Sequence, residues 1–285
     1  MKVFLNYDLD EIDRQYDAAA TVPDLGVYIQ RYTEVSARAR QRFAGKLDLQ
    51  YGPTRAEVLD VYPAETVDAP IHLFIHGGYW RRLSKNESCF MVETFVPAGA
   101  TVVAVNYALA PKVSIDEIVR QNRAAIAWIY RHARDLGADP ERIYISGHSA
   151  GGHLVGMMLS TDWEGEYGLP ANLIKGACTI SGVFDLEPLR FTRINAWAQL
   201  DVGAVLRNSP IHHLPEVGCP LIVSYGGLET KEFRRQSDEY AAKWSTHGFP
   251  CRTVDMPDFN HFTVVEELNN PESPLTRAVF EQMSL

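Results

Sequence analysis

The sequence has few cysteines, and they are not spaced as metal ligands or as a redox pair. No two of the four form a CxxC motif, and three lie in or beside apolar segments, so we expect small buried side chains rather than a disulfide framework. These cysteines are Cys89, Cys178, Cys219 and Cys251. His212 and His213 lack a partner at zinc spacing, and the acidic stretch 8–13 lacks the glycine and distal glutamate of a calcium loop. We therefore predict no metal site.

The sequence also lacks a cluster of basic residues and a long apolar run. Lysine and arginine number 27 against 36 aspartates and glutamates, and the resulting net charge of −9 argues against a nucleic-acid partner. The first 20 residues carry acidic side chains where a signal peptide needs an apolar core, and no run approaches the length of a membrane span. We therefore expect a cytoplasmic protein with no membrane partner.

The remaining composition is ordinary for a soluble globular protein. Apolar residues make up 46% and charged residues 22% of 285 residues. A chain of this length suits a single α/β domain with insertions, so we predict one domain over residues 1–285. The sequence does not specify the oligomeric state, and a homodimer is one option.

Strand-like and helix-like segments alternate along most of the chain. Residues from about 1 to 45 predict a helical N-terminal extension with a partly amphipathic pattern. Strand-like segments rich in Val and Ile follow at 47–52, 57–64, 71–78, 101–111, 142–151, 174–185, 219–227 and 251–258. Helix-length segments lie between them at 86–97, 114–136, 149–160 and 231–246. This alternation predicts a doubly wound, mostly parallel sheet with functional groups at the carboxyl ends of its strands.

One segment, from about 185 to 215, interrupts the alternation. It shows no strand periodicity and contains two large aromatic residues, Phe191 and Trp197. We interpret it as a small cap insertion that covers the functional site.

Ser149 lies in a GHSAG motif between a strand-like and a helix-like segment. The motif G-x-S-x-G by itself is weak evidence, but here it follows RIYIS and precedes an apolar helical segment. Gly147 and Gly151 permit the tight strand-to-helix turn that exposes the hydroxyl, which is the pattern of a nucleophile elbow. We therefore predict that Ser149 is a catalytic nucleophile.

A serine nucleophile needs a general base and a group that orients this base. In this kind of fold the acid follows the serine and the histidine comes last, and His261 is the only histidine after the final expected strand. Glu229 lies in the turn after the strand-like segment 219–227, where the acid is expected. Asp185, at the end of the preceding strand-like segment, is the alternative acid.

A glycine loop upstream of the elbow, HGGYW at 76–80, has backbone N–H groups suited to an oxyanion hole. We predict that Gly78 and Tyr79 from this loop and Ala150 from the elbow bind the negative charge of a tetrahedral intermediate. The combination predicts hydrolysis of an ester or amide through an acyl-enzyme, without a metal or another cofactor.

The pairing of HGGYW with GHSAGG resembles the kynurenine formamidase, or arylformamidase, family of the α/β-hydrolases, within the hormone-sensitive-lipase-like branch. Further segments resemble bacterial members, so that the resemblance runs from about residue 8 to the C-terminus. These segments are LDLQYGPTRAEVLDVYPA, VNYALAP, ISGVFDLEPL, NSPIHHL and GGLETKEFRRQS. One departure concerns Glu229, because many members of the family have aspartate at this turn.

The resemblance implies an α/β-hydrolase fold, with Ser149 as nucleophile, His261 as base and the acid at the turn that holds Glu229. It also implies N-formylkynurenine or a similar aryl formamide as the small-molecule substrate. An aromatic leaving amine needs apolar walls, for which we expect Trp80, Phe191 and Trp197 beside Tyr79. The alternatives are a carboxylesterase for short or medium acyl esters and a non-catalytic binding protein of the same fold.

Overall fold

The computed structural model describes all 285 residues and contains one eight-stranded sheet. The strands are β1 (Lys46–Gln50), β2 (Val58–Tyr62), β3 (Ala69–Ile75), β4 (Thr101–Val105), β5 (Ala138–His148), β6 (Ile174–Ile180), β7 (Leu221–Gly226) and β8 (Cys251–Met256). Their order across the sheet is β1-β2-β4-β3-β5-β6-β7-β8. β1 and β2 pair antiparallel, β2 is antiparallel to β4, and all other pairs are parallel. The expected α/β-hydrolase class is confirmed.

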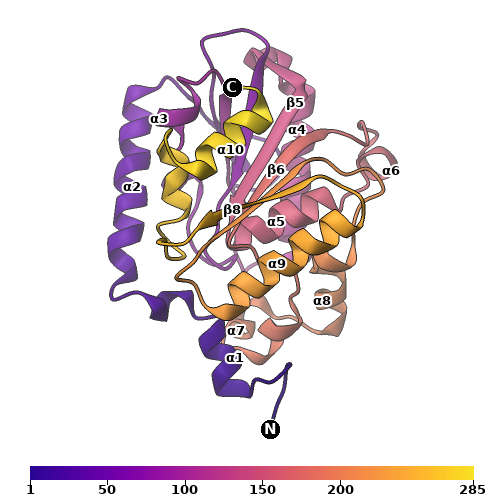
Figure 1. Ribbon diagram of the computed structural model, residues 1–285. Coiled ribbons are helices and arrows are strands. Elements are labelled where there is room, and N and C mark those ends of the chain that lie inside the picture. The colour runs from indigo at the N-terminus through magenta and orange to yellow at the C-terminus, as the bar shows by residue number, and fades with distance from the viewer.

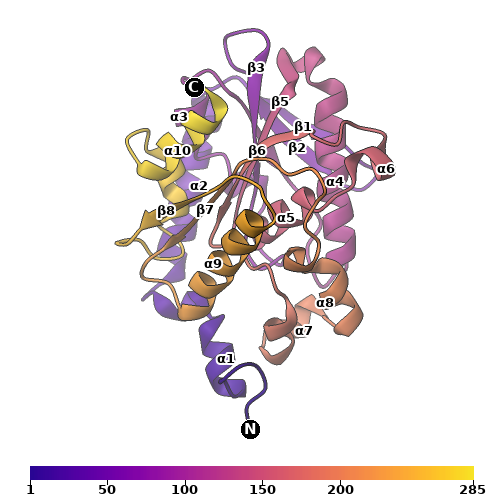
Figure 2. The same cartoon turned by 45° about the vertical axis from the view of Figure 1, so that its right-hand side comes forward.

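The central strands are buried on both faces because helices cover the sheet from two sides. Every residue of β3 and of β4 is buried, which explains their mostly apolar composition. Figures 1 and 2 show α2 (Leu25–Arg42), α3 (Val92–Phe95) and α10 (Pro274–Met283) on one side of the sheet. On the other side lie α4 (Ile115–His132), α5 (Ala150–Leu159), α6 (Trp163–Tyr167) and α9 (Lys231–Thr246). This layering places the loops after the parallel strands at one end of the molecule.

Two segments outside the regular alternation lie at that end. The N-terminal extension consists of α1 (Leu9–Gln15), the 3₁₀ turn η1 (Ala18–Thr21) and α2. The cap consists of η4 (Glu187–Phe191), α7 (Asn195–Ala198), α8 (Val202–Asn208) and η5 (Pro210–His212). α1 contacts η4 of the cap, and the backbone N–H of Arg193, which lies between η4 and α7, donates to Asp13 Oδ1 at 2.7 Å. The extension and the cap are therefore in direct contact.

The segment 86–97 differs from the single helix that its length predicted. It forms a 3₁₀ turn, η2 (Lys85–Glu87), and then the one-turn helix α3. Residues 88–92, which follow η2 and extend to the first residue of α3, are all buried. The N–H of Cys89 donates to Oγ of Ser36 on α2 at 3.1 Å and not to a carbonyl group of its own segment, which interrupts a continuous helix. No helix of the protein combines the length and apolar character that a transbilayer segment needs.

Candidate active site

Ser149 lies at the sharp turn between β5 and α5. Its backbone angles are φ 57° and ψ −119°, a conformation that is unfavourable for a residue with a side chain. A Cβ atom on Gly147 would lie 2.3 Å from the carbonyl oxygen of Gly151, and one on Gly151 would lie 2.0 Å from that of Ile75. Both positions therefore require glycine, as the nucleophile-elbow prediction assumed.

His261 and Glu229 form a buried hydrogen-bonded pair on the loops that follow β8 and β7. Nδ1 of His261 lies 2.6 Å from Oε2 of Glu229, and the two residues are 3% and 5% exposed. The other carboxylate oxygen accepts hydrogen bonds from the Ser181 hydroxyl at 2.5 Å and from the Gly226 N–H at 2.6 Å. Both oxygens of Glu229 are thus held, so the carboxylate fixes the orientation of the imidazole.

Asp185, the alternative acid, has a different set of contacts. Its carboxylate accepts from the Glu187 N–H at 2.9 Å and so starts the first turn of the cap. Its own N–H donates to Gln236 Oε1 at 2.7 Å. The structure therefore places Glu229, and not Asp185, against His261.

His148, the residue before Ser149, supports the loop that carries His261. Its Nε2 donates to the carbonyl oxygen of His261 at 2.7 Å, and the two rings lie 4.7 Å apart. Burial lowers the pKa of His148 well below its usual value, and the nearby His261 lowers it further. His148 is thus a neutral N–H donor that holds the loop. The rings of Phe233 and Phe262 pack on two other sides of His261, with centroids 4.5 and 5.2 Å away.

The glycine loop after β3 closely approaches the elbow. A Cβ atom on Gly77 would lie 2.6 Å from the His148 carbonyl oxygen, so only glycine lets the two backbones come together. Gly78 and Tyr79 follow with positive φ angles of 94° and 49°. The backbone N–H groups of Gly78, Tyr79 and Ala150 donate no hydrogen bond within the protein. They are therefore available to an oxygen atom of a ligand.

Ser149 and His261 line a cavity of about 860 Å³ at this end of the sheet. Gly78, Tyr79 and Trp197 also line it. The N-terminal extension forms a further wall of the cavity, which was not predicted from the sequence. These wall residues are Tyr16, Asp17, Ala18, Ala19, Ala20, Leu25, Ile29 and Tyr32. The sequence signal for this wall is the amphipathic pattern of α2. This pattern indicates that one face of the helix is packed, but it does not identify the surface on which the helix packs.

The expectation of a substrate wall is wrong for Trp80 and Phe191. Trp80 is fully buried, donates its indole N–H to His153 Nδ1 at 3.2 Å, and does not line the cavity. Its positive φ of 56° turns its side chain away from the site and into the core. Phe191 packs beneath the Arg190 guanidinium, 5.6 Å from it, and likewise lies outside the cavity wall. Of the three expected residues, only Trp197 lines the cavity.

The chain is similar to proteins of one enzyme family over nearly its whole length. Residues 59–216 match the family model described as BD-FAE. The chain is 34% identical over 288 residues to kynurenine formamidase of Salmo salar, covering 96% of each chain. It is 33% identical over 287 residues to kynurenine formamidase of Danio rerio, again covering 96% of each.

A solved structure agrees with these relatives. The crystal structure of a candidate thioesterase from Silicibacter sp. TM1040 has 28% sequence identity and a TM-score of 0.84, covering 94% of this chain and 98% of that one. The arrangement of elbow, loops and sheet is thus that of a hydrolase of this fold. The chain belongs to the kynurenine formamidase family of α/β-hydrolases, and it is a serine hydrolase.

Proposed function

We propose that this protein hydrolyses an aryl formamide, such as N-formylkynurenine, through a formyl-enzyme formed on Ser149. The observation that carries the proposal is the buried Glu229–His261 pair beside Ser149 in a cavity where three backbone N–H groups have no partner. The kynurenine formamidases among its relatives supply the substrate class.

In the first half-reaction, Ser149 Oγ attacks the formyl carbon while its proton passes to Nε2 of His261. Glu229 accepts the Nδ1–H of His261, which keeps Nε2 available as the base and stabilises the imidazolium that forms. The carbonyl oxygen becomes an oxyanion, and the N–H groups of Gly78, Tyr79 and Ala150 bind it. When the C–N bond breaks, His261 gives its proton to the leaving aryl amine.

In the second half-reaction, a water molecule takes the place of the amine. His261 accepts a proton from this water, whose oxygen attacks the formyl carbon of the formyl-serine. The same N–H groups bind the second oxyanion. The ester bond to Ser149 then breaks, His261 returns a proton to the serine oxygen, and formate leaves.

The walls of the cavity fit an aromatic amine that carries a carboxylate. Trp197 provides an aromatic face, and the guanidinium of Arg81 lies over its ring at 4.6 Å. Arg81 and Arg82 both line the cavity, and neither forms an ion pair within the protein. A carboxylate on the leaving group would therefore find an unpaired cation next to an apolar wall.

A carboxylesterase is the second candidate, because the same catalytic groups hydrolyse esters. One observation favours it: the cavity is large for a formyl group, and Leu25, Ile29 and Tyr32 offer apolar surface to a longer acyl chain. The two functions differ in which half of the substrate occupies this volume.

Steady-state kinetics separates the two candidates. We expect N-formylkynurenine to have a higher kcat/KM than a p-nitrophenyl ester of a medium acyl chain. A preference for the ester of tenfold or more, about 1.4 kcal/mol of transition-state discrimination, would transfer the assignment to the carboxylesterase. Ser149→Ala serves as the control for both substrates, since it should abolish turnover and labelling by a fluorophosphonate probe. Activity that survives this substitution would show that Ser149 is not the nucleophile.

A further inference from the structure

The backbone of Tyr79 is held in place by contacts from two segments outside the hydrolase core. Its φ of 49° lies in the left-handed region, which is unfavourable for a residue with a Cβ atom. Its hydroxyl donates to the carbonyl oxygen of Tyr16 in the N-terminal extension at 2.6 Å. Its own carbonyl oxygen accepts the indole N–H of Trp197 from the cap at 3.1 Å.

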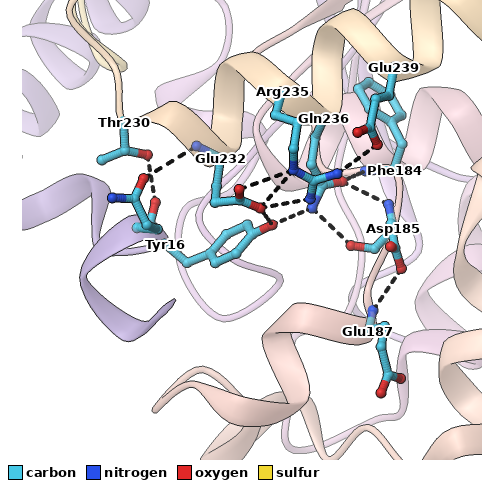
Figure 3. A network of polar contacts seen from close by, with 10 residues as sticks. Tyr16, Phe184, Asp185, Glu187, Thr230, Glu232, Arg235, Gln236 and Glu239 are labelled. Carbon is cyan, nitrogen blue, oxygen red and sulfur yellow. Dashed lines mark hydrogen bonds and ion pairs between the residues drawn. The ribbon is translucent and has the colours of Figure 1, made fainter. Parts of the chain in front are cut away.

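The acceptor in the N-terminal extension is itself fixed by a buried polar network (Figure 3). The hydroxyl of Tyr16 donates to Glu232 Oε2 at 3.0 Å and accepts from Gln236 Nε2 at 2.6 Å. Arg235 in turn holds the carboxylate of Glu232 through contacts of 2.7 to 3.0 Å. Tyr16, Glu232 and Gln236 are each 1% exposed, so these bonds are shielded from water.

The same network reaches the start of the cap. Oε1 of Gln236 accepts the N–H groups of Phe184 and Asp185 at 2.6 and 2.7 Å, as Figure 3 shows. Nε2 of Gln236 also donates to the carbonyl oxygen of Asp185 at 2.9 Å. The helix α9 thus anchors two segments: the N-terminal extension, which binds the Tyr79 hydroxyl, and residues 184–185, which connect β6 to the cap.

Contacts on both sides of the N–Cα bond of Tyr79 determine where its N–H points. Rotation about φ turns the preceding peptide group, which carries this N–H, relative to the side chain and the carbonyl group of Tyr79. The preceding peptide group is held through its oxygen, because the carbonyl of Gly78 accepts the N–H groups of Arg81 and Arg82 at 3.0 Å. The side chain and the carbonyl group of Tyr79 are held by Tyr16 and Trp197. The strained angle can therefore relax only if a bond on one of the two sides breaks.

We propose that Trp197 and Tyr16 are positioning residues that hold the Tyr79 N–H in the oxyanion hole. The proposal rests on the oxyanion role assigned to Tyr79 in the proposed function. It makes the cap and the N-terminal extension contributors to transition-state stabilisation, in addition to walls of the cavity. A wall residue stabilises substrate and transition state alike, whereas a positioning residue acts on the transition state alone.

Tyr79→Phe and Trp197→Phe test the proposal, because each keeps an aromatic ring and removes one hydrogen bond. With p-nitrophenyl acetate as substrate, we expect each variant to lower kcat about tenfold and to leave KM within about twofold. Phenylboronic acid forms a tetrahedral adduct with an active serine, so its Ki should rise by the same factor as kcat falls. Tyr130→Phe, which removes the hydroxyl contact between Tyr130 on α4 and Glu141 on β5, is the matched control and should retain wild-type values.

The possible outcomes distinguish this proposal from the proposed function. A raised KM with unchanged kcat in Trp197→Phe would make Trp197 a wall only and would overturn the proposal. Wild-type kcat and boronate Ki in both variants would also overturn it, while an inactive Ser149→Ala would leave the proposed function intact. If Trp197→Phe does not fold, as thermal denaturation would reveal, the kcat and boronate Ki of Tyr79→Phe decide the question.

Discussion

At the scale of single residues, substitutions of Glu229 and Asp185 test which carboxylate orients His261. Glu229→Gln removes the charge that orients His261, and an amide at this position favours the wrong imidazole tautomer, so we expect kcat to fall by about 10³- to 10⁴-fold. Asp185→Asn changes only a turn of the cap and should cost less than tenfold. Single-turnover measurements on both variants check the ranking. The reverse ranking would assign the role to Asp185.

The sequence correctly indicated where residues in a motif or at the end of a strand lie. It did not indicate the direction in which a side chain in a loop points. The GHSAG motif and the order of the chain predicted Ser149, His261 and an acid at Glu229 or Asp185, and the structure brings Ser149, Glu229 and His261 to adjacent loops. Trp80 was misplaced because its left-handed backbone points the indole into the core. No spacing rule reports the φ angle of a non-glycine residue in a loop.

At the scale of secondary-structure elements, α2 supports the loop that carries His261. The hydroxyl of Tyr32 donates to the carbonyl oxygen of Phe262, the residue after His261, and both residues are buried. Tyr32→Phe leaves this carbonyl without a partner, so we expect a loss of about 1–3 kcal/mol in the free energy of unfolding. Urea denaturation measures the loss, with Tyr130→Phe on α4 as the control. Equal stability of Tyr32→Phe and the wild type would show that this contact does not stabilise the fold.

The strands were predictable as elements because buried parallel strands carry a strong composition signal. Each of the eight expected strand segments overlaps one strand of the sheet, and α9 has the expected bounds. The C-terminal helix α10 was not expected, although Ser273 caps it and Pro274 occupies its first turn. The wall formed by the N-terminal extension was also missed, since amphipathicity shows that a helix packs but does not name its partner.

At the scale of the whole molecule, buried histidines should make the fold sensitive to mild acid. Burial lowers the pKa of His72 to about 3 and those of His76 and His153 to about 4. His72 is stacked on Phe95 at 4.0 Å and His76 on Tyr107 at 4.1 Å. Nδ1 of His72 and Nε2 of His76 have no hydrogen-bond partner. Protonation would therefore place an unpaired charged group in the core.

The sign of the pH dependence follows from these lowered pKa values. Above about pH 6.5 the histidines are neutral in both states and stability is complete, whereas below it the unfolded chain binds protons that the folded protein excludes. We expect each histidine to remove about 1.4 kcal/mol per pH unit until the pH approaches its folded pKa. Urea denaturation between pH 7.5 and 5 measures the slope. The substitution His72→Asn should reduce the slope by the contribution of one proton, about 1.4 kcal/mol per pH unit. The substitution His247→Gln, at an exposed position, should leave the slope unchanged. A flat profile would contradict the prediction.

The contacts of the N-terminal extension also constrain the order in which a newly synthesised chain assembles. Tyr16 reaches Glu232 across 216 residues, and Tyr32 reaches Phe262 across 230. The ribosome makes α1 and α2 before the sheet, and α2 can pack against η2 and α3 early, because these follow within about 60 residues. In contrast, α1 contacts η4 and α9, which are translated much later. The buried side chains of Ile12 and Tyr16 therefore lack their native contacts during most of synthesis, and a chaperone can bind them in this period.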